Sequence, residues 1–271
     1  MSIDVSAFKQ GQKMMWASGN YPEVARRIEG VAQVLVERVG AAPGLEMLDV
    51  ATGSGNVAIA AAGAGAKVTG LDLTPELLDA ARRRAADAKL GVRFIEGDAE
   101  ELPFEKDSFD RVTSCFGVIF APRHERAAGE LTRVARPGAT IAVTAWTPQG
   151  LVGRTFKTVS RHMPAPPPGL EPPVMWGEED HVRSLFADSG AELSFERRTV
   201  SFSHDSPESW VEHDERILGP AIMAKAALEP QGRYDELRED MMRLYRESNE
   251  ADDGSFRARA EYLLTVARMP A

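Results

Sequence analysis

The sequence has little of what marks secreted, disulfide-bonded or membrane proteins. Its 271 residues include one cysteine, Cys115, which excludes an internal disulfide and fits a reducing compartment. The N-terminal stretch MSIDVSAFKQ has no basic lead and no apolar segment, so we predict no secretory signal. The most membrane-like stretch, NVAIAAAGAGA at residues 56–66, is too short to cross a bilayer. We therefore expect a cytoplasmic protein with no membrane partner.

The sequence also has fewer basic than acidic residues. Lysine and arginine together number 32 against 41 aspartates and glutamates, giving a net charge of -9 and a pI near 5.2. Such a surface repels phosphate backbones, so we expect no nucleic-acid partner. Hydrophobic residues make up 43% of a chain long enough for one domain, residues 1–271, with a large buried core. The sequence leaves both a monomer and a homodimer open.

What the sequence does contain is a regular alternation of strand-like and helix-like segments in its first half. Strands are expected at 45–51, 67–72, 92–96, 109–116 and 140–146, and helices at 56–63, 75–88 and 124–135. Pro137-Gly138 is expected to terminate the last of these helices. This order predicts an α/β fold whose mostly parallel sheet binds ligands at the carboxyl ends of its strands.

The second half follows a different pattern. Residues 164–173 (PAPPPGLEPP) are proline-rich and should form a stiff, extended connection before a helix at 178–189. Residues 192–203 and 256–267 read as strands, and helical segments fill 207–249 between them. We expect these two strands to pair antiparallel and the helices to form a lid.

A glycine-rich turn, LDVATGSGNVA at residues 48–58, is the sharpest motif. Asp49 lies near the end of a strand, and Gly53 and Gly55 make a tight turn to which a ligand can come close. The helix that starts at Asn56 offers free backbone N–H groups. Taken alone, the turn fits a nicotinamide enzyme, a methyltransferase or a turn that binds nothing.

Two aspartates follow the next two strands. Asp72 ends VTGLD and can accept hydrogen bonds from both hydroxyls of a ribose, or it can simply favour the adjacent helix N-terminus. Asp98, in FIEGDAEELPF, can accept the amino group of adenine beside the backbone N–H of Ala99, although a Gly-Asp turn is the plainer interpretation. In register with Asp72, the adenine interpretation is favoured.

These motifs, followed by DSFDRVTSCFGVIF at 107–120 and LTRVARPGATIAVTAW at 131–146, resemble class I S-adenosylmethionine-dependent methyltransferases. The nearest branch is the small-molecule group of ubiquinone/menaquinone methyltransferase-like enzymes (methyltransferase type 11). The resemblance implies a Rossmann-like, seven-stranded sheet with an antiparallel last strand and a helical lid insertion. It covers the cofactor-binding core, 45–146, and is weaker in the cofactor-covering arm, 1–40, and in the acceptor-pocket and lid elements, 147–190 and 205–250.

The resemblance also assigns roles to residues of this chain. Gly53, Gly55 and Asn56 would bring the backbone close to the methionine part of the cofactor, and Asp49 would orient its amino group. Asp72 would hold the ribose and Leu73 would cover the adenine. Asp98 and Ala99 would bind the adenine edge. Cys115 stands where a main-chain carbonyl often receives the amine, and Ala51 replaces a glycine of many relatives. Trp16 and Tyr21 would close over the cofactor or, alternatively, only anchor the N-terminal arm.

No residue stands out as catalytic. Methyl transfer from a sulfonium needs mainly position and a dry pocket. His124, His181 and His213 are weak candidates for a base. His124 is better explained as a surface residue at a helix start, and the other two as surface or packing residues. No metal-ligand motif is present, so no metal is expected. Several apolar residues could line an acceptor pocket or belong to the core: Phe116, Phe120, Trp146, Met163, Trp176, Trp210 and Met223.

The favoured hypothesis is methyl transfer from S-adenosylmethionine to oxygen, nitrogen or carbon of a small apolar or aromatic metabolite, of the kind found in secondary metabolism. S-adenosylhomocysteine would be the product. The alternative is a protein of this fold that binds the cofactor without methylating. A nicotinamide enzyme would leave GDAEELPF and RVARPGA unexplained, and a nucleic-acid methyltransferase would need an N/D-P-P-aromatic segment where Cys115-Phe116-Gly117-Val118 stands.

Overall fold

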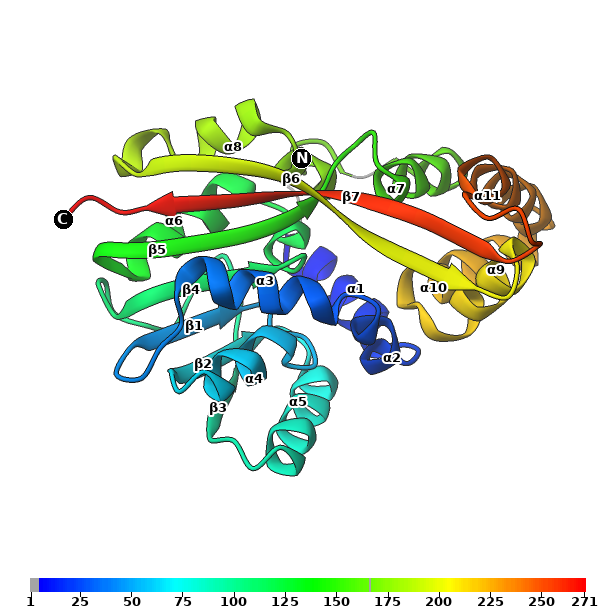
Figure 1. Ribbon diagram of the computed structural model, residues 1–271. Coiled ribbons are helices and arrows are strands. Elements are labelled where there is room, and N and C mark those ends of the chain that lie inside the picture. The colour runs from blue at the N-terminus through cyan, green and yellow to red at the C-terminus, as the bar shows by residue number, and fades with distance from the viewer. Residues whose placement is uncertain (1–4, 166) are drawn as a thin grey trace.

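The computed structural model describes residues 5–165 and 167–271. Within these ranges seven strands form one sheet in the order β3-β2-β1-β4-β5-β7-β6 (Figure 1). The strands are β1 (Glu46–Val50), β2 (Lys67–Asp72), β3 (Val92–Glu96), β4 (Phe109–Cys115), β5 (Ala135–Trp146), β6 (Glu192–His204) and β7 (Phe256–Arg268). β1 to β5 pair in parallel, and β7 runs antiparallel to both β5 and β6. The predicted mostly parallel sheet with an antiparallel last strand is confirmed.

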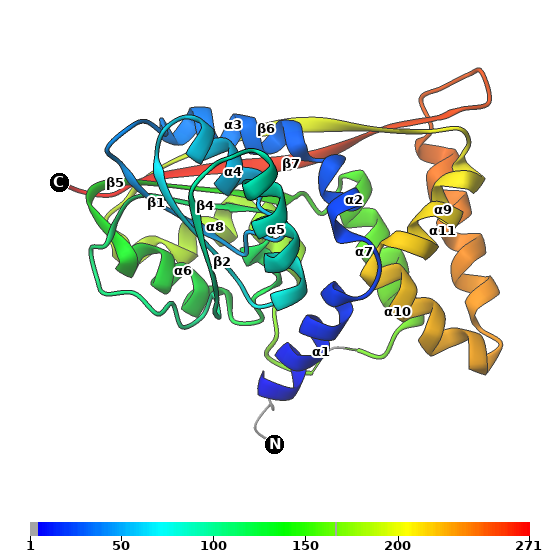
Figure 2. The same cartoon turned by 90° about the horizontal axis from the view of Figure 1, so that it is seen from below.

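Helices cover both faces of the parallel part of the sheet. One face carries α3 (Glu29–Val39), α4 (Asn56–Gly63) and α5 (Pro75–Asp87), and the other carries α6 (His124–Val134) and α8 (Glu179–Leu185), as Figure 2 shows. The strands are apolar because both of their faces are buried: Met47, Leu48 and Val50 of β1 are fully enclosed. This layering exposes the carboxyl ends of β1, β2 and β4 at one edge.

A helical insertion connects the two long strands β6 and β7. It contains α9 (Pro207–Ile217), α10 (Gly219–Leu228) and α11 (Tyr234–Ser248), which gather beyond the end of the core in Figure 1. The start of helix α9 is fixed by a capping box, in which the Ser206 hydroxyl accepts the Ser209 N–H. The predicted antiparallel pair with helices between its strands is thus confirmed.

The N-terminal arm consists of α1 (Val5–Ala17) and α2 (Tyr21–Arg26). Figure 2 shows α1 lying between the core and the inserted helices. α1 contacts α5 on one side and α10 on the other. None of the described helices is long and apolar enough to cross a membrane.

One predicted strand boundary is wrong, and one helix was not predicted. β5 begins at Ala135 and not at residue 140, because Ala135 already pairs with Phe109 of β4. Thr140 then pairs with Arg111, and Pro137-Gly138 lies in the bulge between these two pairs. Helix α7 (Leu151–His162) was not predicted. Gly153 lies inside this helix and lowers its predicted helix propensity. Glycine is required at this position, because a Cβ there would come 2.2 Å from the Thr147 carbonyl oxygen.

The remaining short helices follow the chain between these elements. They are η1 (Val118–Phe120), η2 (Pro173–Gly177), η3 (Ala187–Ser189) and η4 (Glu229–Gln231). The predicted helix at 178–189 is therefore α8 followed by the short turn η3. α8 packs on α6 and η2 packs on β5.

Candidate active site

The turn after β1 has an unusual backbone. Ala51, Gly53 and Gly55 all have positive φ, at 52°, 55° and 85°. The Gly53 N–H donates to the Asp72 carboxylate at 2.8 Å, which ties this turn to the end of β2. The Arg84 guanidinium donates to the Ser54 carbonyl at 2.7 Å and braces the turn from α5. The sequence pattern therefore builds a rigid loop that exposes backbone at the sheet edge.

Asp72 is buried, and each of its carboxylate oxygens accepts a backbone N–H. One carboxylate oxygen accepts the Gly53 N–H and the other accepts the Thr74 N–H at 2.9 Å. Burial raises the pKa of Asp72, while these backbone hydrogen bonds oppose the shift. Each oxygen retains acceptor capacity, because a carboxylate offers about four lone-pair sites. Asp72 can therefore still accept two hydroxyl groups.

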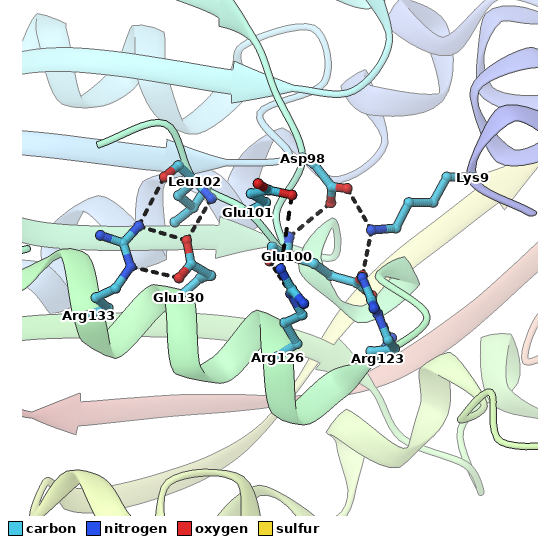
Figure 3. Close-up of polar contacts among 9 residues, drawn as sticks. All are labelled: Lys9, Asp98, Glu100, Glu101, Leu102, Arg123, Arg126, Glu130 and Arg133. Atoms are coloured by element: carbon cyan, nitrogen blue, oxygen red, sulfur yellow. Dashed lines mark hydrogen bonds and ion pairs between the residues drawn. The ribbon is translucent and has the colours of Figure 1, made fainter. Parts of the chain in front are cut away.

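Asp98 faces the same edge and is linked to the N-terminal arm (Figure 3). Lys9 of α1 forms ion pairs with Asp98 and with Glu100, each at 2.5 Å. The Glu100 side chain is completely buried, and it also accepts the Arg123 N–H at 2.6 Å. Arg123 thus brings the start of α6 into the same network. These contacts fix α1 across the carboxyl ends of the strands.

Asp49 lies directly behind the turn and is almost fully enclosed. Its carboxylate accepts hydrogen bonds from the hydroxyls of Thr52 at 2.5 Å and Thr113 at 2.9 Å. Burial raises the pKa of Asp49 to about 7, although both hydroxyls lower it. A cation at the turn would restore the ionised form.

A cavity with an empty volume of about 700 Å³ lies at this edge, and we name it the edge cavity. Eight of the predicted cofactor residues line it: Trp16, Tyr21, Ala51, Gly53, Asp72, Leu73, Asp98 and Ala99. Asp72 and Asp98 therefore line one common space. Tyr21 lies over the glycine turn, since a Cβ on Gly53 would come 2.8 Å from its ring.

Four predicted residues do not line the edge cavity: Asp49, Gly55, Asn56 and Cys115. Gly55 serves packing, because a Cβ there would meet Ala81, Ile59 and Phe94 at 3.2–3.3 Å. The Asn56 amide donates to the Ala25 carbonyl at 2.8 Å and so links α4 to α2. Burial raises the pKa of the Cys115 thiol to about 12, which keeps it neutral.

A second, larger cavity adjoins the first and lies between the core and the inserted helices. This insertion cavity has an empty volume of about 1630 Å³. Four aromatic residues line both cavities and form a collar between them: Trp16, Tyr21, Phe116 and Phe120. Further aromatic side chains line the insertion cavity alone: Trp146, Phe156, Phe202, Trp210, Tyr234 and Tyr245.

The collar depends on a strained turn after β4. Phe116 has a φ of 55° and stacks on Trp146 with ring centroids 3.8 Å apart. The Ser114 hydroxyl accepts the Val118 N–H at 2.8 Å and holds this turn closed. Backbone strain of this kind, about 1–3 kcal/mol, persists where the surroundings fix it and often marks a functional site.

Charged groups in the insertion cavity are paired. The Arg27 guanidinium forms an ion pair with Asp214 at 2.6 Å and lies 4.1 Å from the centre of the Trp210 ring. Glu215 pairs with Arg238 at 3.1 Å. The cavity wall is therefore mostly apolar, with its charges neutralised at one side.

The three candidate bases lie outside both cavities. His124, expected to be a surface residue if not catalytic, is fully buried at the start of α6, 3.0 Å from His181. His213 contacts His204 and Glu23 at the base of α9. Two residues considered for the acceptor pocket also lie elsewhere, because Trp176 packs against Phe186 and Met223 is exposed. Phe116, Phe120, Trp146, Met163 and Trp210 do line the insertion cavity.

Sequence reasoning missed several residues of the edge cavity. Lys9, Gln12 and Thr74 line it, and the Gln12 amide donates to the Phe120 carbonyl at 2.7 Å. Lys9 and Gln12 are three residues apart on α1 and thus share one helix face. This spacing was the only local sequence feature that could have grouped them. Nothing in the local sequence indicates the distant partners that they meet.

The strand order 3-2-1-4-5-7-6, the antiparallel β7 and the glycine turn beside two strand-end aspartates define the class I methyltransferase architecture. The Methyltransferase domain family matches residues 48–143. Over 214 residues the chain is 42% identical to the uncharacterized protein Rv1403c of Mycobacterium tuberculosis, covering 78% of each. It is 42% identical over 117 residues to a demethylmenaquinone methyltransferase of Thermus thermophilus, covering 41% of this chain and 53% of that enzyme.

A solved structure shares the fold at lower identity. The Haemonchus contortus phosphoethanolamine N-methyltransferase 2, in complex with S-adenosylhomocysteine, superposes with a TM-score of 0.57 at 19% identity. The match covers 89% of this chain and 53% of that one. The chain belongs to the class I S-adenosylmethionine-dependent methyltransferase family and is a methyltransferase.

Proposed function

We propose that this methyltransferase binds S-adenosylmethionine in the edge cavity and methylates a small, apolar acceptor held in the insertion cavity. The observation that carries the proposal is the junction of the two cavities at one aromatic collar. A cofactor at the strand edge and an acceptor among the inserted helices would meet there. The cofactor supplies a methyl group on a positively charged sulfur, and it leaves as S-adenosylhomocysteine.

The residues of the edge cavity fit the cofactor's parts. Asp72 has two oxygens with acceptor capacity for the ribose hydroxyls, and Leu73 and Leu77 offer an apolar wall for a flat base. Asp98 lies where an exocyclic amino group can donate to it. Asp49 stands behind the glycine turn and offers a negative charge to the amine end. This assignment follows the roles implied by the family resemblance.

The collar would contribute in two ways. Aromatic faces attract a cation, so Trp16, Tyr21, Phe116 and Phe120 favour the charged sulfur. The same rings exclude water from the reacting atoms. Burial raises the pKa of Tyr21, so its hydroxyl stays protonated and can donate a hydrogen bond but does not act as a base at neutral pH. Position and desolvation are then the main catalytic contributions.

The insertion cavity indicates the acceptor class. Its wall is built from aromatic and aliphatic side chains, and the paired charges of Arg27 and Asp214 leave no free ion to bind a strongly charged acceptor. We infer an aromatic or otherwise apolar acceptor, methylated at oxygen, nitrogen or carbon. The similarity to a demethylmenaquinone methyltransferase supports a test with reduced quinones.

A turnover assay tests this function. Purified protein is incubated with methyl-labelled S-adenosylmethionine and with naphthoquinols, phenols, indoles, ethanolamine phosphate or amino acids, and label in each acceptor is measured. We expect label only in apolar aromatic acceptors. Transfer confined to the hydrophilic acceptors would contradict the acceptor class. Cofactor binding without transfer to any acceptor would favour the alternative of a protein that binds the cofactor without methylating.

A further inference from the structure

A cluster of metal-ligating side chains lies outside both cavities, beside α6 and α8. His124 is the first residue of α6, His181 belongs to α8, and Glu171 lies in the connection between α7 and η2. One ligand atom from each residue lies within 4.8 Å of the other two. None of the three residues lines the edge cavity or the insertion cavity. The methyltransferase site therefore does not account for them.

The distances around this cluster define a small triangle. His124 Nδ1 is 3.0 Å from His181 Nε2. Glu171 Oε2 lies 3.5 Å from His124 Nδ1, and the other carboxylate oxygen, Oε1, lies 3.8 Å from His181 Nε2. An ion bound tetrahedrally at about 2.0–2.1 Å separates its ligand atoms by about 3.3 Å. The observed separations lie close to that value.

The two histidine rings are at hydrogen-bond distance from each other, whereas Glu171 is not at hydrogen-bond distance from either ring. Both distances from a histidine nitrogen to the Glu171 carboxylate are longer than an N–H···O hydrogen bond, which spans about 2.7–3.2 Å. His124 is fully buried, and its Nε2 has no partner with hydrogen-bond geometry. The ring packs against Trp176, with the two ring centroids 5.7 Å apart. Its Nδ1 is held in place, facing the other two groups.

We propose that His124, Glu171 and His181 bind one divalent transition-metal ion, with Zn²⁺ as the best match to two imidazoles and one carboxylate. Such a set leaves a fourth position for water. This site could not be expected from the sequence, because the three residues are far apart along the chain and follow no short metal-binding spacing. The proposal is independent of the cofactor and acceptor assignments.

The ion would fix a wall of the insertion cavity. Glu171 lies on the same connection as Met163 and Pro164, and these two residues line that cavity. His124 and His181 belong to helices that pack on the core. Coordination would therefore tie the segment that carries Glu171 to the rigid part of the molecule. Metal-dependent protection of this segment is a readout separate from methyl transfer.

The experiment titrates Zn²⁺ and Co²⁺ into chelator-treated full-length protein. Binding is followed by calorimetry, by the visible spectrum of four-coordinate Co²⁺ and by limited proteolysis after residue 162. We expect one ion per chain and slower cleavage between α7 and η2. His181→Ala and Glu171→Gln should each weaken binding by about 100-fold, since a lost ligand costs at least as much as a lost outer-shell partner, which is about 10–100-fold.

His181 and Glu171 are the better variants because their side chains are 11% and 39% exposed, whereas replacing buried His124 endangers folding. His162→Ala is the matched control, since His162 pairs with Asp240 at a different place. It should bind metal like the parent protein, and circular dichroism checks that each variant is folded. The proposal is overturned if the parent protein binds neither ion, or if His181→Ala and Glu171→Gln bind as tightly as His162→Ala does.

Discussion

At the level of single residues, two buried aspartates at the strand edge differ in their surroundings. Asp72 is held by backbone N–H groups, whereas Asp49 is held by the hydroxyls of Thr52 and Thr113. Backbone donors cannot move away, so Asp72 is a fixed acceptor for a ligand. Asp49 is so deeply buried that its ionisation depends on whether a cation is bound at the glycine turn.

The ionisation of Asp49 makes cofactor affinity depend on pH. Because burial raises its pKa to about 7, the free protein holds a proton there that an unfolded chain releases near pH 4. Ionisation therefore costs stability as the pH rises from about 4 to about 7, and a bound ammonium group offsets that cost. Affinity for S-adenosylhomocysteine should rise by up to about tenfold between about pH 6 and about pH 8. Calorimetry across this range measures it, and Asp49→Asn should flatten the dependence; an equally steep curve in that variant would contradict the assignment.

Ala51 carries a backbone cost that glycine would remove. Its φ of 52° costs about 1–2 kcal/mol for a residue with a Cβ. Ala51→Gly should therefore stabilise the protein by about 0.5–1 kcal/mol after the greater freedom of glycine in the unfolded chain is subtracted. A melting temperature higher by about 1–4 °C is expected.

The same substitution in a helix provides the control. Ala60 lies within α4, where Ala→Gly should destabilise by about 1 kcal/mol. Equal losses of melting temperature in Ala51→Gly and Ala60→Gly would show that the turn after β1 is not strained.

At the level of elements, α1 is held across the strand edge by a partly buried ion-pair network. Lys9 reaches Asp98 and the buried Glu100. Lys9→Met should loosen α1, because a buried carboxylate loses one of its partners. Amide exchange in residues 5–17 should become about tenfold faster, equal to about 1.4 kcal/mol in the opening equilibrium.

Lys13 on the same helix tests whether position matters. Its ion pair with Glu96 is more exposed, so Lys13→Met should leave exchange of α1 almost unchanged. If both variants exchange alike, the docking of α1 does not rest on Lys9.

Helix α10 contributes a wall of the insertion cavity. Ala221 lines the cavity, whereas Ala226 on the same helix is exposed. Ala221→Phe should occupy acceptor space and raise the KM for the acceptor by about tenfold or more while leaving S-adenosylhomocysteine affinity unchanged. Ala226→Phe should change neither quantity. Steady-state kinetics decides, and an unchanged KM in Ala221→Phe would place the acceptor elsewhere.

The elements that could be predicted from sequence are those with local signals. β1, β2 and β3 form from short, mostly apolar segments, and α5 begins at Thr74-Pro75 as its cap predicts. α7 was missed because Gly153 interrupts its pattern for a packing reason. The bulge at Pro137-Gly138 was missed because it depends on pairing with β4. Elements that have a local sequence signal could thus be predicted, whereas features that depend on tertiary contacts could not.

At the level of the whole molecule, the sheet edge, the N-terminal arm and the inserted helices together make a path between two cavities. The positions of Asp72 and Asp98 at the sheet edge could be predicted because Asp72 ends β2 and Asp98 lies two residues after β3. Lys9 and the convergence of His124, Glu171 and His181 could not, since they depend on contacts between distant segments. Residues of the edge cavity that lie at strand ends could therefore be predicted from the sequence, whereas the insertion cavity depends on contacts between distant segments.

The measurement that most directly tests the account is calorimetric titration with S-adenosylhomocysteine. We predict one site per chain with an affinity near micromolar, about -8 kcal/mol. Asp72→Ala should lose about 1–3 kcal/mol through missing hydrogen bonds to the ribose. Asp79→Ala, on the exposed face of α5, should bind like the parent protein. Absence of binding heat in the parent protein, or unchanged affinity in Asp72→Ala, would contradict the account.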